Sequence, residues 1–399
     1  MWSSRRTFLA GGLGATLTSC SKPPAPTAEK SASTKLVLEE FQPKSMLVVP
    51  EHPIVKAKYP VIDVHTHLAS VFGRRRAPES GGPSPEAVKQ LDQIMQWMDE
   101  INLQTLINVS GGYGDDLKRN VEVLGKYKGH YANCITPAWD KVQEPDYPKW
   151  QADELKRGKD AGAIGLKIAK TLGLYLRERG KEGPLVKVDD PRFDPMWEAA
   201  GELKLPVVIH TGDPDAFFTP IDRFNERWEE LANHPDWSFY GKDFPPKAEL
   251  LAARNRVIER HPKTQFIGLH VANHPENLDE VSTWLKKFPN LHVEIGARIG
   301  ELGRQPRRSR KFFGEFPDRI MFGTDATPNG KNVPQQDLRP PMFQAYFRFL
   351  ETEDEYFDYA PSEVPPQGRW RIYGIGLPDA ILKKVYHNNA AKLFGMKTI

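Results

Sequence analysis

The stretch YPVIDVHTHL, residues 59–68, places two histidines, His65 and His67, at the end of an apolar run. A short apolar run of this kind favours a buried β-strand. In a strand, residues i and i+2 point to the same face, so both imidazole rings are expected to project together. A bare His-x-His pair is a weak signal with several explanations. Whether the pair has a function depends on which other residues of the chain lie close to it in the folded protein.

Seven further apolar runs follow the first one, and amphipathic segments separate them. The eight runs cover residues 61–68, 103–110, 131–139, 163–170, 206–212, 264–272, 291–297 and 319–326. The helical patterns cover residues 85–101, 115–127, 193–204, 249–261, 277–288, 307–316 and 377–395. Eight alternating β-then-α units predict an α/β protein with a (β/α)₈ TIM barrel. The alternative is an open doubly wound sheet, which is weakened because no Gly-x-Gly-x-x-Gly follows the first strand.

Two connections between the predicted elements are long. Residues 212–248 follow the fifth strand, and residues 326–372 follow the eighth and are rich in aromatic residues and proline. Long insertions in a compact domain are usually lids or binding loops. We therefore expect long loops after strands 5 and 8 to shape a binding site.

Three more chemically active residues close later strands. His210 ends the fifth run, His270 the sixth and Asp325 the eighth. In a barrel, the carboxyl ends of all strands surround one mouth, so these side chains are expected to converge with His65 and His67. A single histidine at a strand end is more often a hydrogen-bonded, half-buried residue than a ligand. The joint pattern favours a metal site.

Imidazole and carboxylate groups are good ligands for zinc and similar divalent ions. Such an ion lowers the pKa of water toward about 7 and so provides a nucleophile at neutral pH. A carboxylate beside that water can accept its proton. The donor set therefore predicts metal-dependent chemistry.

The motifs IDVHTH, VVIHTG, FIGLH, MFGTD and NNAAKLFG together resemble the amidohydrolase superfamily, specifically its amidohydrolase-related (Amidohydro_2) branch. The resemblance covers about residues 59–397. It implies a distorted barrel with a divalent metal, most often zinc, with manganese, iron or cobalt as alternatives. It further implies that the metal ligands are His65, His67 and His210. Asp325 would be a ligand or a proton acceptor, and His270 would orient the water or stabilise developing negative charge.

Two other residues could extend this site. In binuclear members of the superfamily, a lysine on the fourth strand is carboxylated and bridges two metals, and Lys167 stands at that place. The alternative is a lysine that only attracts an anionic substrate, and we favour one metal over two. Arg298, after the seventh strand, could bind a substrate carboxylate through two hydrogen bonds. Later arginines, from Arg304 on, fit a solvated helix start equally well.

The N-terminus resembles a twin-arginine export signal fused to a lipoprotein signal. Arg5 and Arg6 precede a short apolar stretch that ends in Leu-Thr-Ser-Cys20. That stretch is too short to span a bilayer. We expect a signal peptide over residues 1–19, a flexible tether over residues 20–58 and a metal-dependent hydrolase barrel over residues 59–399. The expected location is the periplasm or the cell surface, with a lipid at Cys20 as the only membrane contact.

The formal net charge of the 399 residues is +3, which does not suggest a nucleic-acid-binding protein. Three functions remain open. The first is a metal-dependent hydrolase that acts on an amide, ester or lactone of a small molecule. The second is a non-oxidative decarboxylase or hydratase on the same scaffold. The third is a lipoprotein that binds a solute without turnover. The sequence leaves the substrate and the oligomeric state open, including a homo-oligomer.

Overall fold

The structure is a computed structural model that describes residues 36–68, 71, 84–179, 183–241, 243–328, 330 and 333–399. The chain divides into two units, Met1–Met46 and Leu47–Ile399. The described part of the first unit contains one 3₁₀ turn, Leu38–Glu40. The second unit begins before Tyr59, the predicted start of the barrel domain. The predicted signal, with Arg5, Arg6 and Cys20, lies outside the described residues.

The second unit contains one parallel sheet of eight strands in the order in which they occur in the chain. The strands are β1 Val61–Thr66, β2 Leu103–Asn108, β3 Tyr131–Ile135, β4 Ala163–Ile168, β5 Val207–Ile209, β6 Phe266–Gly268, β7 Leu291–Glu294 and β8 Ile320–Met321. Each strand lies within one of the eight apolar runs, so the predicted (β/α)₈ barrel is confirmed.

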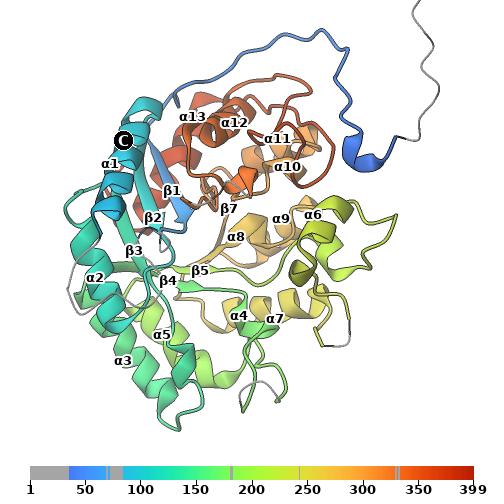
Figure 1. The fold of residues 1–399 in the computed structure, drawn as a ribbon. Helices are drawn as coiled ribbons and strands as arrows, with labels where there is room; N and C mark the ends of the chain where they lie inside the picture. The colour runs from blue at the N-terminus through green and yellow to red at the C-terminus, as the bar shows by residue number, and fades with distance from the viewer. Residues whose placement is uncertain are drawn as a thin grey trace, which may run out of the picture. The chain divides into compact units, whose positions relative to one another are not determined.

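Helices surround this sheet, as Figure 1 shows for α1, α2, α3 and α5. The longer helices are α1 Pro85–Ile101, α2 Gly114–Leu124, α3 Tyr147–Asp160, α5 Asp194–Glu202, α7 Lys247–Arg260, α9 Leu278–Lys287, α11 Pro306–Glu315 and α12 Pro340–Glu351. The shorter ones are α4 Thr171–Leu174, α6 Trp228–Asn233, α8 Leu269–Ala272, α10 Ile299–Leu302, α13 Asp379–Lys383 and α14 Asn389–Leu393, with a π-helical turn at Lys384–Asn388. The sequence patterns do not predict α3 or α12, and α12 lies within the long connection after β8. No helix in the described ranges combines the length and apolarity that a membrane crossing requires.

The first and last strands meet at a seam that carries the candidate site residues. The backbone N–H of Asp325 donates to the carbonyl of His65 at 2.8 Å, and that of His67 donates to the carbonyl of Ala326 at 2.8 Å. A parallel bridge also pairs Thr66 with Ala326. The seam therefore closes the barrel at the His-Thr-His segment.

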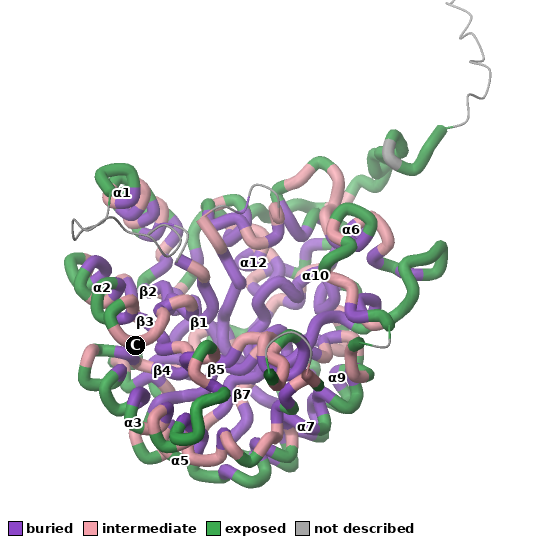
Figure 2. Tube along the Cα trace, turned by 60° about the horizontal axis from the view of Figure 1, so that its bottom comes forward, coloured by how far each residue is buried: buried purple, intermediate pink, exposed green. Residues whose placement is uncertain are grey.

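Apolar side chains fill both sides of the strands. Figure 2 shows the buried residues along the strands and the exposed ones mainly on the outer helices and loops. One cluster of buried residues joins the strands to the C-terminal helix; it contains Ile62, Val64, Ile107, Val109, Cys134, Val208, Ile267, Leu269, Met321, Ala390, Ala391 and Phe394. Burial on both faces explains why the strand sequences show little polar alternation.

The backbone after β6 turns in the left-handed sense. The φ angles of His270, Val271, Ala272 and Asn273 lie between +54° and +59°. Left-handed backbone costs about 1–2 kcal/mol per residue for L-amino acids, and none of these four is a glycine. Hydrogen bonds hold the turn, because the side chain of Asn273 accepts from Thr211 N at 2.9 Å and its N–H donates to the Leu269 carbonyl at 2.8 Å. The turn brings the His270 ring into the barrel mouth.

Gly268 makes room for this turn, and its replacement provides a test. A Cβ at residue 268 would lie 2.9 Å from Cα and Cβ of Ala272. Gly268→Ala is therefore expected to lower the free energy of unfolding by about 1–3 kcal/mol, as overpacked core substitutions do. Chemical denaturation measures this change. The control is Gly314→Ala in α11, where nothing lies within 4 Å of the added Cβ. Its stability is expected to stay the same or to rise by up to about 1 kcal/mol.

Candidate metal centre

The His-Thr-His segment and Asp325 form the centre of the site. The Nε2 atoms of His65 and His67 each lie 3.0 Å from the same oxygen of Asp325, Oδ1. The centroids of the two imidazole rings are 5.3 Å apart. The two rings therefore point toward one carboxylate, as the spacing in β1 predicts.

His270 reaches the same place from the left-handed turn. Its Nε2 lies 3.9 Å from Oδ2 of Asp325. One potential ligand atom from each of His65, His270 and Asp325 lies within 4.8 Å of the others. The three residues are almost completely buried, with exposed fractions of 0%, 1% and 9%. Three donors in so small a buried space match the ligand number of a catalytic metal site.

The hydrogen bonds fix which nitrogen of His270 can bind a ligand. Its Nδ1 lies 2.7 Å from the carbonyl oxygen of Gly296, which only accepts, so Nδ1 carries the proton. Burial, with Arg298 nearby, holds the pKa of His270 well below its usual range, so the ring is neutral. Its Nε2 is then a bare lone pair, and no described residue bonds to it. In this form His270 can bind a metal or orient water, but it cannot donate to a developing negative charge.

His65 has the matching arrangement. Its Nδ1 lies 3.4 Å from Oε1 of Glu294, a buried carboxylate at the end of β7. A carboxylate that accepts from Nδ1 of an imidazole orients the ring, so Nε2 of His65, which lies 3.0 Å from Asp325, can bind a metal once it has lost its proton. The same Oε1 accepts from the backbone N–H of His270 at 2.5 Å. Glu294 thus holds two candidate ligands, and the donor set fits a divalent metal ion.

Asp325 is held in its charged form. Burial alone would raise its pKa, but the positive charge of His65 and the hydrogen bonds from His65 and His67 keep the pKa of Asp325 well below its usual range. The side-chain amide of Gln336 also donates to Oδ2. An ionised carboxylate in this position can bind a cation or accept a proton.

His210 lies beside this group but points elsewhere. Its ring centroid is 4.5 Å from that of His270, while its Nε2 lies 3.2 Å from Oδ1 of Asp213. Burial lowers the pKa of His210 to about 4, so its imidazole is neutral at pH 7. His210 is not part of the 4.8 Å group. Its role as a metal ligand stays a prediction.

Lys167 lies on β4 with its amine inside the barrel. Its Nζ is 3.3 Å from Nε2 of His65, and burial lowers its pKa to about 8. The lysine is therefore close enough to touch a ligand, as a bridging role would require. The geometry fits one metal with a neighbouring lysine equally well, and the preference for one metal stays a prediction.

Several residues of the site are absent from the sequence-based prediction. One is Glu294, which lies inside the barrel and bonds to both His65 and His270. Its position at the end of an apolar strand is the signal that could have shown this. Gln336 and Asp213 come from loops without a strand pattern to locate them, whereas Lys170 is the last residue of the fourth apolar run. Arg304 lies outside the site and pairs with Glu226 at 2.8 Å.

A cavity of about 140 Å³ lies beside the site, and His210, His270, Asp325 and Gln336 are among its lining residues. Three cations line it, namely Lys170, Arg227 and Arg298. Lys170 pairs with Asp213 at 2.6 Å, and Arg227 pairs with Glu230 at 2.7 Å. Arg298 is 6% exposed, its nearest carboxylate oxygen lies 3.9 Å away, and its Nε has no partner among the described residues. Burial of a guanidinium without a close anion is costly, so Arg298 is suited to receive one.

A second group of potential ligands, Asp215, His274 and Glu276, lies outside this cavity. Nε2 of His274 lies 3.2 Å from Glu280, and Nζ of Lys247 lies 2.5 Å from Asp215. The lysine already places a positive charge on this group. His274 therefore does not extend the site at the mouth.

The chain matches one protein family. The model of one family, described as amidohydrolase, matches residues 62–396. Comparison with curated proteins gives no match.

The solved structures that match this chain have low sequence identity to it. One is 2,6-dihydroxybenzoate decarboxylase from Rhizobium, with 14% identity, coverage of 84% of this chain and 99% of that chain, and a TM-score of 0.49. Another is 5-carboxyvanillate decarboxylase from Novosphingobium aromaticivorans, solved with manganese and a nitrobenzoic acid, with 16% identity, coverage of 87% and 100%, and a TM-score of 0.48. A TIM-barrel protein from Bordetella bronchiseptica has 15% identity, coverage of 84% and 98%, and a TM-score of 0.48.

Proposed function

The chain belongs to the amidohydrolase family, and from this premise we propose that it is a metal-dependent hydrolase of a small anionic molecule. The bond attacked would be an amide, an ester or a lactone. The observation that carries the proposal is the convergence of His65, His67, His270 and Asp325 beside a cavity that contains the under-paired Arg298. A buried set of nitrogen and oxygen donors next to an anion-binding group suits hydrolysis of a carboxylated substrate.

A divalent ion held by His65, His67 and Asp325, with His210 as a further ligand, would polarise the scissile carbonyl and lower the pKa of the attacking water. The protein residues perform the remaining steps. Nε2 of His270 accepts a hydrogen bond from the water and aligns it. The carboxylate of Asp325 takes the proton of the water, and Gln336 holds that carboxylate in place. The proton then passes to the leaving amine or alcohol.

Lys170 and Arg298 would fix the orientation of the substrate. Both line the cavity and face Asp213, at 2.6 Å and 3.9 Å. A substrate carboxylate that binds Arg298 supplies the anion that this buried guanidinium needs. The reacting carbonyl is then held against the histidines while the charged end is bound by the cations.

The same cations favour a second candidate, a non-oxidative decarboxylase. A substrate carboxylate held next to Asp325 and His270 could also leave as carbon dioxide, and Asp325 would deliver the proton that takes its place on the substrate carbon. No oxygen atom from water enters the organic product of this reaction. The two candidates therefore differ in the fate of solvent oxygen.

Reaction in water enriched in ¹⁸O separates the two candidates. The metal-loaded protein is incubated with N-acyl amino acids, carboxylated lactones and hydroxybenzoates, and the products are analysed by mass spectrometry. A hydrolase is expected to place one ¹⁸O in the new carboxylate and to release no carbon dioxide. Release of carbon dioxide without ¹⁸O in the organic product would reject the hydrolase in favour of the decarboxylase.

A further inference from the structure

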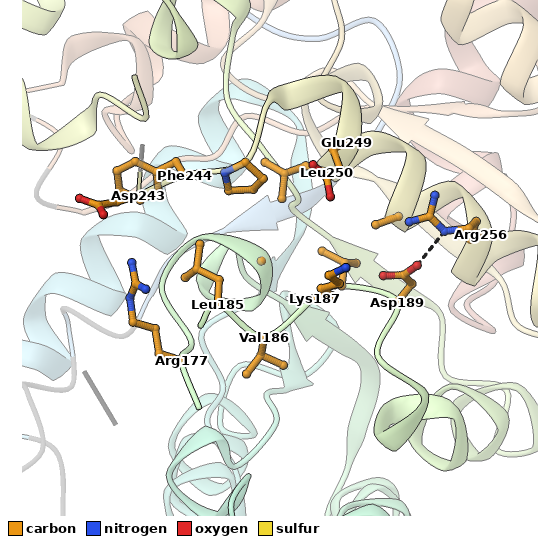
Figure 3. Close-up of a pocket in the computed structure, with 14 residues that line it drawn as sticks. Arg177, Leu185, Val186, Lys187, Asp189, Asp243, Phe244, Glu249, Leu250 and Arg256 are labelled. Carbon is orange, nitrogen blue, oxygen red and sulfur yellow. Dashed lines mark hydrogen bonds and ion pairs between the residues drawn. The ribbon is translucent and has the colours of Figure 1, made fainter. Parts of the chain in front are cut away.

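A second cavity lies away from the metal centre and shares no lining residue with the catalytic cavity. It holds about 370 Å³ between residues 173–177 and 185–189, which follow β4, and residues 243–256, which end the connection after β5 and enter α7. Figure 3 shows the two segments facing each other across the space. Small-molecule sites commonly have volumes of about 300–1,000 Å³, so this cavity has the size of a ligand site.

The interior of this cavity is apolar. Val186, Val188, Leu250 and Ala253 line it and are 1%, 2%, 3% and 6% exposed. Gly173 lies among them with φ +97°, and a Cβ there would lie 2.8 Å from Cγ2 of Val188 and 3.0 Å from Cδ2 of Leu250. The floor is thus packed tightly beneath the space. An apolar part of a ligand would bury its surface on this floor.

The walls of the cavity carry charges of opposite sign. Asp243 and Glu249 come from one segment, and Arg177 and Lys187 come from the other, and Figure 3 shows the two acids above the two bases. None of the four makes an ion pair with any other residue in the described ranges, although Arg177 donates to the carbonyl of Gly183 at 3.1 Å.

One pair of charged residues in the same cavity does form an ion pair, unlike these four. Arg256 and Asp189 line the same cavity and join at 2.7 Å. The four unpaired charges are therefore left facing the space between the segments, where a ligand can reach them.

We propose that this cavity binds a small zwitterion with an apolar side chain, of the α-amino acid type. An anion would be attracted by the two bases of the cavity but repelled by its two acids. A cation would be attracted by the acids but repelled by the bases. A zwitterion pairs with both walls, its carboxylate with the bases and its ammonium with the acids. Its side chain covers the floor formed by Val188, Leu250 and Ala253.

Aromatic rings separate this site from the catalytic cavity. Phe244 lines the second cavity, and its ring packs against the buried Phe239 at a centroid distance of 5.2 Å. On the other side of that partition, Nζ of Lys170 lies 5.2 Å from the centroid of Phe239. A ligand in the second cavity is therefore not expected to displace a substrate, and its binding does not depend on the proposed reaction.

Titration calorimetry of the full-length protein tests the proposal with three matched probes. L-phenylalanine carries both charges, 3-phenylpropionate only the negative one and phenethylamine only the positive one. L-phenylalanine is expected to bind at one site per chain, with affinity at least about tenfold above that of either singly charged analogue. Equal binding of an analogue, or no saturable binding of L-phenylalanine and L-leucine at millimolar concentration, would overturn the proposal.

Variants on both walls locate the binding site. Lys187→Met and Glu249→Gln change exposed residues without an ion pair, so both variants are expected to fold, and each should weaken L-phenylalanine binding by about tenfold or more. The control is Glu259→Gln, which lies on the same helix α7 but pairs with Lys287 outside the cavity. The control should bind as the unmodified protein does. Unchanged binding in both wall variants would place the ligand elsewhere and reject the site.

Discussion

Asp325→Asn is expected to lower kcat by about 10²–10⁴-fold, the usual contribution of general acid–base catalysis. The amide keeps the shape of the side chain and one oxygen toward His65 and His67, but it cannot accept the proton of the attacking water. The metal content is expected to remain largely unchanged, because the histidines still supply nitrogen ligands. Steady-state kinetics and elemental analysis of the same preparation measure both effects.

The control for this variant is Asp358→Asn. Asp358 pairs with Arg371 at 2.6 Å, its side chain is 54% exposed, and it does not line the catalytic cavity. Its kcat is expected to stay within twofold of the unmodified protein, a change of about 0.4 kcal/mol in the activation free energy. Unchanged turnover in Asp325→Asn would remove Asp325 from its role as proton acceptor.

Removal of the metal is expected to abolish turnover and to lower the melting temperature. A ligand that binds only the native state stabilises it by about 4 kcal/mol at 1,000 times its dissociation constant. Dialysis against a chelator followed by activity assays and calorimetry measures the loss. Addition of Zn²⁺, Mn²⁺, Fe²⁺ or Co²⁺ in separate samples then shows which ion restores activity.

The control for metal removal is dialysis of a matched sample against the same buffer without chelator. This sample should keep its activity and its melting temperature. A purified protein that contains no stoichiometric transition metal and gains none on reconstitution would contradict the proposed function. That result would favour the third function inferred from the sequence, a lipoprotein that binds a solute without turnover.

The sequence predicts the barrel and the meeting of its strand ends because both follow from short-range rules. Apolar runs define the strands, and parallel strands place their carboxyl ends together, so His65, His67 and Asp325 could be brought together from their positions alone. Lys167 is identified by the family resemblance, which places a lysine on the fourth strand. These inferences need no knowledge of loops.

The rest of the site depends on interactions that no local pattern encodes. The left-handed turn at residues 270–273 contains no glycine, and it is held by Asn273 and Glu294, which belong to different segments. The orientation of His210 toward Asp213 likewise depends on a loop conformation. Gln336 meets Asp325 only because the connection after β8 folds back over the mouth.

The seam between β1 and β8 determines when the site can form during synthesis. A ribosome produces the two histidines of β1 early and Asp325 only after the other six strands, so the ligand set is incomplete until nearly the whole barrel has been translated. The hydrogen bond from Asp325 N to the His65 carbonyl joins the end of the barrel to its first strand and holds Asp325 beside the histidines. A truncated or unclosed chain holds histidines without their carboxylate. The complete ligand set for the metal ion therefore exists only in a chain that has been synthesised through Asp325, and a shorter chain is expected to be inactive.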